Sequence, residues 1–92
     1  MKLIAEAHPV DADKLLEHLV ELAEGLGVEV RRVDLGGGGG SLVRLRDKHV
    51  MFVDTSAYPD DQLPRLAADL AQCSDLQNVY MLPELRELID GT

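Results

Sequence analysis

The residues that could do chemistry gather in one stretch of the sequence, residues 28–54. Five consecutive glycines, at positions 36–40, are followed within nine residues by two arginines and a histidine. Successive backbone N–H groups of a glycine loop can surround an anion, and nearby cations would strengthen the binding. We therefore expect a candidate anion or partner site formed by Gly37, Gly38, Gly39, Arg44, Arg46 and His49. The alternative is that residues 36–41 are a flexible connecting loop without a ligand.

Other familiar sites do not match this sequence. A phosphate-binding loop needs a lysine after its last glycine, but Gly40 is followed by Ser41 and Leu42. A dinucleotide fingerprint needs its glycines to open a helix, and here a strand is expected to follow. The possible metal donors, His8, His18, His49 and Cys73, are not spaced as ligand pairs. The sequence therefore predicts no catalytic residue, no metal and no cofactor.

Size and composition limit the class of protein. A chain of 92 residues with 46% hydrophobic residues predicts one globular domain over residues 1–92. The single cysteine, Cys73, is typical of a reducing, cytoplasmic location. No apolar run approaches the roughly 20 residues of a membrane span, and residues 1–5 are too short an apolar start for a signal peptide. The net charge of −8 makes nucleic acid an unfavourable partner.

The charge is unevenly distributed along the chain. Residues 31–48 hold five cations against two acids, a local balance of +3, whereas the remainder holds four cations against fifteen acids. One interpretation is that cationic strands attract the acidic helices that cover or flank them. The other is that the basic segment binds an anion or an acidic partner. No aromatic residue lies between these cations, so they do not form a base-stacking platform.

Alternating apolar residues predict three strands, at 28–35, 42–46 and 49–54. The glycine loop joins the first two, and a two-residue turn at Asp47-Lys48, or a slightly longer one, joins the last two. With the two-residue turn, the side chains that share one face are Val43, Leu45, Val50 and Phe52. We expect this set to form the core.

The opposite face of these strands is mixed. It carries Leu42, Met51 and Val53 beside the cationic residues. Because a small sheet with apolar residues on both faces is often covered on the second by a partner, we expect these three residues to form an interface.

Helical spacing of leucines predicts helices at 11–26 and from residue 60 to about 72. Asp11 or Asp13 would cap the first helix and Asp60 or Asp61 the second, and Gly27 is the preferred terminator of the first. Residues 79–81 are expected to form a short fourth strand, and Pro83 opens a terminal helix. Residues 2–5 are a short edge strand or a loose lead-in. The prediction is an α+β fold of order α-β-β-β-α-β-α, a three-stranded meander packed on helices.

Residues 40–75 carry a resemblance to a known family. The glycine turn, the two strands of LVRLRDKHVMFVD and the helix after them resemble the core of the small zinc metallopeptidase-like domains associated with phage-type repressors. In that family the helix carries Ala-His-Glu-Leu-Gly-His, where this chain has Ala67-Ala68-Asp69-Leu70-Ala71-Gln72. The resemblance thus implies a relative that has lost both zinc histidines, with Asp69 in place of the general-base glutamate.

A second resemblance is to short uncharacterised bacterial proteins that have a glycine-rich turn, a basic strand and a Leu-Pro-x-Leu-Arg ending, here at residues 82–86. It implies no activity. From the missing chemistry and the mixed sheet face we expect a non-enzymatic interaction or regulatory module, self-associating or binding a protein partner. The alternative is a small anion- or metal-binding protein, a decayed metallohydrolase relative.

Overall fold

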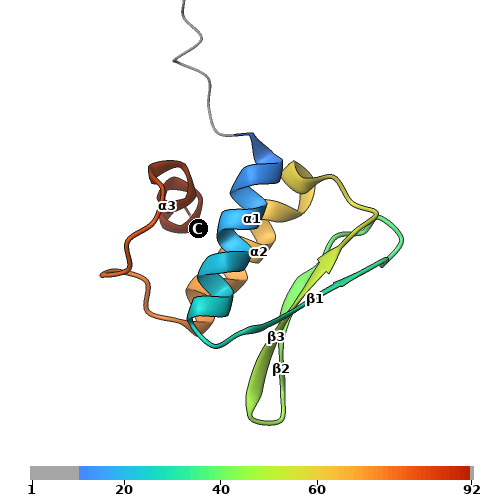
Figure 1. The fold of residues 1–92 in the computed structure, drawn as a ribbon, viewed down its shortest axis with the longest axis horizontal. Coiled ribbons are helices and arrows are strands. Elements are labelled where there is room, and N and C mark those ends of the chain that lie inside the picture. The colour runs from blue at the N-terminus through green and yellow to red at the C-terminus, as the bar shows by residue number, and fades with distance from the viewer. Residues whose placement is uncertain (1–10, 92) are drawn as a thin grey trace, which may run out of the picture.

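The structure, a computed structural model, describes residues 11–91. Its elements follow the chain as α1 (Ala12–Gly25), β1 (Glu29–Val33), β2 (Ser41–Leu45), β3 (Lys48–Asp54), α2 (Pro59–Cys73) and α3 (Pro83–Asp90). Figure 1 shows the three strands as one sheet, α1 and α2 packed together against it, and α3 on the far side of these two helices. The α+β class is confirmed. The predicted edge strand at residues 2–5 and the donor His8 lie outside the described residues.

Helix α1 forms as its sequence predicts. The carboxylate of Asp11 accepts a hydrogen bond from the backbone N–H of Lys14, which gives the helix a side-chain cap. Gly27 then adopts a φ of +89°, and the N–H of Val28 donates to the carbonyl of Ala23. This left-handed glycine ends the helix because residues with a Cβ are strained in that conformation.

The predicted meander is wrong, because β3 and not β2 is the central strand. The strand order is β1-β3-β2, with β1 parallel and β2 antiparallel to β3. Strand β3 contains the uninterrupted apolar run from Val50 to Val53, whereas β1 and β2 carry the arginines. The apolar strand is buried between two neighbours, and the charged strands take the edges, where charges discourage pairing with other chains.

The turn between β2 and β3 lies one residue earlier than predicted. Arg46 and Asp47 form it, so Leu45 pairs with Lys48 and Val43 pairs with Val50. The β3 partner of each β2 residue is therefore two positions earlier than predicted. Because a shift of two keeps every side chain on its face, the predicted sets of residues that share a face stay intact.

The predicted assignment of these two sets to core and surface is wrong. Met51 and Val53 are 0% and 3% exposed in the core shared with α1 and α2, and Leu42 packs against the same core. The four predicted core residues therefore face away from the helices. Leu45 among them is 43% exposed.

The C-terminal third differs from the prediction in two details. Tyr58 is the N-cap residue of α2, and Asp60 and Asp61 lie in the first turn, where they face the positive end of the helix dipole instead of capping it. Residues 79–81 form no strand. The guanidinium of Arg86 donates to the carbonyl of Val79, which holds this segment against α3.

Candidate functional site

The face of the sheet that the described helices leave uncovered carries a strip of apolar side chains. Val33, Val43 and Phe52 are half-buried on it, and Leu45 is exposed. Val50, in the middle of β3, is fully buried between its neighbours in the sheet although it is not part of the helix-facing core. The apolar surface of such a strip stays in contact with water unless another surface covers it.

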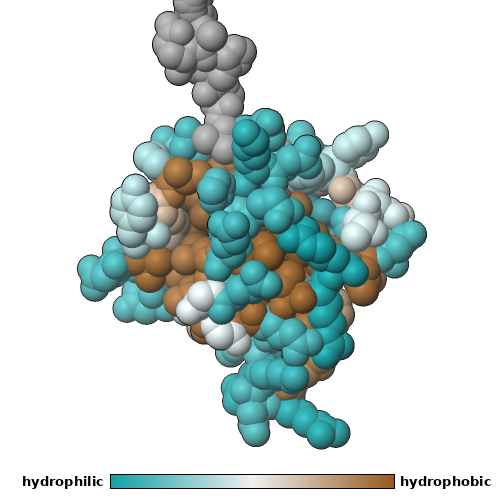
Figure 2. Space-filling model, viewed as in Figure 1, coloured by the Kyte–Doolittle hydropathy of each residue, from teal (hydrophilic) through white to brown (hydrophobic). Residues whose placement is uncertain are grey.

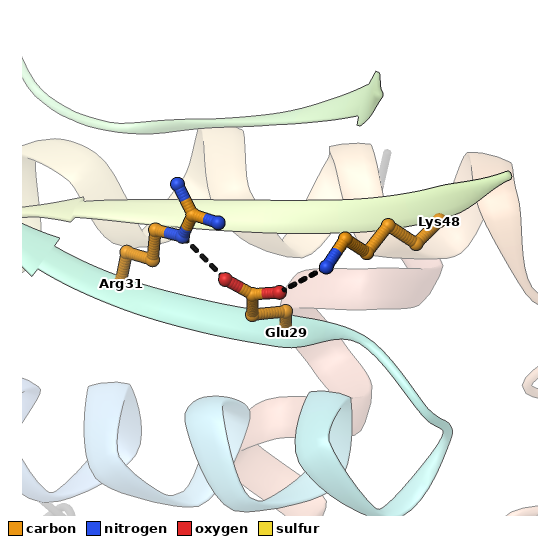
Figure 3. Close-up of polar contacts among 3 residues, drawn as sticks. All are labelled: Glu29, Arg31 and Lys48. Atoms are coloured by element: carbon orange, nitrogen blue, oxygen red, sulfur yellow. Dashed lines mark hydrogen bonds and ion pairs between the residues drawn. The ribbon is translucent and has the colours of Figure 1, made fainter. Parts of the chain in front are cut away.

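Three charged residues on β1 and β3 border this strip. The carboxylate of Glu29 accepts hydrogen bonds from the guanidinium of Arg31 and, at 2.9 Å, from the ammonium of Lys48 (Figure 3). Figure 3 places all three side chains in front of the strands, with the helices behind. The bonds from Lys48 and then Arg31 lower the pKa of Glu29 below its usual range. The group carries one surplus positive charge.

At the other end of β3, the glycine loop does form an anion nest, and the chain's own Asp54 fills it. One carboxylate oxygen of Asp54 accepts from the N–H groups of Leu35 and Ser56, both at 2.9 Å. The other accepts from Gly37 at 3.0 Å and Gly39 at 2.9 Å. Asp54 is 1% exposed, and this burial would by itself raise its pKa, but the four N–H donors outweigh it and lower the pKa.

Gln62, a buried polar residue in the first turns of α2, fixes the loop a second time. Its side-chain oxygen accepts from the N–H of Gly40 at 3.1 Å and from that of Asp54 at 3.0 Å. Its side-chain nitrogen donates to the carbonyl of Asp54 at 2.9 Å. The loop thus crosses the end of β3 and is tied to both β3 and α2. It is not the tip of a hairpin between β1 and β2.

The predicted anion site is divided between the two ends of the sheet. Gly37 and Gly39 lie at the Asp54 end, and Gly38 makes no hydrogen bond to that carboxylate. Arg44, Arg46 and His49 lie at the hairpin end, roughly 17 Å away along β3 at about 3.3 Å per residue. The structure does not bring the two halves together, and the N–H groups of Gly37 and Gly39 that an external anion would need already bind Asp54.

The predicted interface is wrong for a different reason. Leu42, Met51 and Val53 pack under α1 and α2. The N–H of Leu42, on the edge strand β2, donates to the carboxylate of Asp69 at 3.1 Å, and Asp69 also pairs with Arg65. Asp69, which the family resemblance places at a general-base position, therefore joins α2 to the edge of the sheet.

Sequence reasoning missed Asp54, Gln62 and Asp69 as residues that organise the fold. An aspartate directly after an apolar strand, with a glycine run elsewhere in the chain, was an available signal for Asp54, since an acid can fill a backbone nest. For Gln62 the only signal was a polar residue beside the apolar stripe of α2, which is common on any helix.

Comparison with known proteins finds no match for this chain among family models, curated proteins or solved structures. Within residues 11–91 no helix is long and apolar enough to cross a membrane. In the same range, no three histidine, cysteine or acidic side chains are grouped so that they could hold a metal ion.

Proposed function

We propose that this domain is a non-enzymatic interaction module that self-associates through the helix-free face of its sheet. The observation that supports this most is the apolar strip of Val33, Val43, Leu45 and Phe52 on a face that no described helix covers. The same strip excludes Leu42, Met51 and Val53, so the proposed surface is the opposite of the one the sequence predicts.

Charge opposes a second copy less at this face than over the rest of the surface. Two chains that each carry a net charge of −8 repel one another over most of their surfaces. The helix-free face is an exception because Glu29, Arg31 and Lys48 leave it one positive charge. In an isologous dimer, Glu29 of each copy can lie opposite a cation of the other copy, because residue i of one chain contacts residue j of its partner and j contacts i.

The size of the face predicts weak association. Three strands about 4.8 Å apart and up to seven residues long give a footprint of roughly 300 Å². A standard interface buries about 800 Å² on each partner. The face therefore fits a transient dimer that forms at high concentration.

Sedimentation velocity from about 10 µM to 1 mM tests the proposal. We expect the wild-type chain to shift from monomer to a dimer, and a Val43→Lys variant to lose this dimer because the contact would bury an unpaired ammonium group. Gln72→Lys is the matched control, since it adds the same charge at an exposed position of α2. A strictly monomeric wild type, or a Val43→Lys variant that dimerises like the wild type, would contradict the proposal.

The alternative of an anion-binding protein has less support. The glycine N–H groups that would bind the anion donate to Asp54 instead, and the cations of the predicted site lie at the other end of the sheet. The resemblance to metallopeptidase-like domains and the cytoplasmic location stay predictions from the sequence.

A further inference from the structure

A groove with an acidic rim lies among the starts of α1 and α2 and one side of α3. It has a volume of about 380 Å³, and its apolar lining includes Leu15, Leu63 and Leu88. Three acids, Asp60, Glu84 and Glu87, line it as well, and none of them forms an ion pair with any described residue. The groove thus combines apolar surface with unpaired negative charge.

The helix dipoles explain only part of this acidity. Asp60 and Glu84 stand in the first turns of α2 and α3, where acids interact favourably with the helix N-terminus. Glu87 is the fifth residue of α3, beyond the first turn, so the dipole gives no reason for its charge there. Three unpaired carboxylates around one apolar groove would be complementary to a cationic segment with an exposed apolar side chain.

The hairpin between β2 and β3 is such a segment. It protrudes beyond the helices, and Figure 2 shows hydrophilic side chains over its end. Arg44 and Arg46 are exposed there and form no ion pair within residues 11–91, while Leu45 between them is 43% exposed. Lys48 differs because it is paired with Glu29. We define Arg44, Leu45 and Arg46 as the hairpin tip.

We propose that the acidic groove of one copy binds the hairpin tip of a second copy. Leu45 would enter the apolar part of the groove, and the two arginines would face the acids on its rim. This proposal shares Leu45 with the strip on the helix-free face, but its other surface is separate, because none of the groove residues lies on the sheet.

The geometry requires two chains. The turn precedes β3 and α2 follows it, so the tip and the start of α2 are separated by the length of β3, roughly 20 Å. Figure 1 shows the tip and the starts of α1 and α2 at opposite ends of the molecule. A contact between two different surfaces is heterologous, so a pair joined by one contact keeps a free tip on one copy and a free groove on the other, and assemblies can grow beyond two copies.

Residues 1–10 are the competing occupant, since they immediately precede the groove residue Ala12. They contain one lysine and one glutamate, so their side chains offer the groove no net charge. The hairpin tip, with two unpaired arginines, is the better complement.

A charge-swap experiment on the full chain tests the inference. One variant carries Arg44→Glu and Arg46→Glu, and the other carries Glu84→Lys and Glu87→Lys. Each variant alone opposes like charges at the contact, so we expect its association to weaken at least about tenfold in sedimentation equilibrium. An equimolar mixture of the two should associate again, because every tip then meets a groove of opposite charge.

Two controls separate this contact from other effects. Glu24→Lys with Asp75→Lys makes the same change in net charge at exposed sites outside the groove and should not respond to the acidic-tip variant. Raising the salt concentration should weaken the contact between tip and groove, since exposed charges are screened.

The outcomes are distinguishable from those for the helix-free face. Wild-type association that stops at two copies and is unaffected by either charge reversal would overturn the tip-and-groove contact and leave the sheet-face dimer standing. Charge-dependent growth beyond two copies that persists in Val43→Lys would support the contact and count against the dimer. A mixture that stays as dissociated as its two components would overturn the inference and leave residues 1–10 as the occupant to test.

Discussion

At the glycine-loop end of the sheet, the carboxylate of Asp54 is buried and accepts four backbone hydrogen bonds, and the side chain of Gln62 satisfies the neighbouring backbone. At the hairpin end of the same strand, Arg44 and Arg46 are exposed and form no ion pair with the described residues. Charge at the first end is satisfied inside one chain, whereas the two arginines at the second end have no acidic partner among residues 11–91. The comparison agrees with a division in which the loop end serves stability and, as we propose, the hairpin end serves association.

The largest effect we expect is at Gly40, where the loop crosses β3. A Cβ built on Gly40 would lie 1.8 Å from the carbonyl oxygen of Phe52, and backbone cannot move aside as a flexible side chain can. We therefore expect Gly40→Ala to lower the free energy of unfolding by at least about 3 kcal/mol in urea denaturation.

Gly38→Ala is the matched control in the same loop. Nothing lies within 4 Å of its added Cβ, and its φ is not in the left-handed region. A Gly-to-Ala change at such a position stabilises by about 0.4–1 kcal/mol through the unfolded chain. If the two alanine variants unfolded at the same urea concentration, that result would contradict the close contact between Gly40 and the backbone of β3.

The second prediction concerns the pH dependence of stability. The pKa of Asp54 is lowered in the folded state, so its contribution is present above its unfolded pKa of about 3.9 and is lost as the pH falls through the folded pKa. We expect Asp54→Asn to be less stable than the wild type at pH 7 and to lose less stability on acidification. Equilibrium unfolding at several values from pH 7 to pH 2 measures both changes.

In Asp54→Asn, the remaining carboxylates still make the free energy of unfolding depend on pH. Asp34, held by the Ser56 hydroxyl at 2.6 Å and the N–H of Gly36, also has a lowered pKa, as does Glu29. Asp47→Asn is the control at the opposite end of β3, because it removes a carboxylate that forms no hydrogen bond or ion pair with a described residue. Parallel curves for the wild type and Asp54→Asn would show that the nest contributes nothing to folding.

These features differ in how far the sequence could predict them. Period-2 alternation correctly grouped Val43 with Val50 and Leu42 with Met51, because it depends only on the pleat of the strand. It could not decide which group the helices cover, since both groups contain apolar residues. That choice depends on where α1 and α2 pack.

The strand order and the site depend on contacts between distant residues. A glycine run accepts many backbone conformations, so it fits a hairpin and a crossover equally well, and the parallel pairing of β1 with β3 leaves no local signal. The loop does form an anion nest, but for an acid of the same chain, which lies 15 to 19 residues after the N–H groups that bind it. The arginines of the hairpin were visible in the sequence, and the acidic groove that we propose as their partner was not.

The smallest effect we expect is at Arg46, and it separates stability from association at one residue. Arg46 has a φ of +57°, a conformation that costs residues with a Cβ about 1 kcal/mol and costs glycine little. Arg46→Gly should therefore raise the free energy of unfolding by up to about 1 kcal/mol and at the same time weaken the tip-and-groove contact. Arg44→Ala removes a cation from the same tip without a change of backbone strain, so it should weaken association and gain no stability. Urea denaturation at low concentration and sedimentation at high concentration measure the two quantities separately. If Arg46→Gly gained stability and associated as well as the wild type, the arginine would be only a strained turn residue, and the hairpin end would have no distinct role from the loop end.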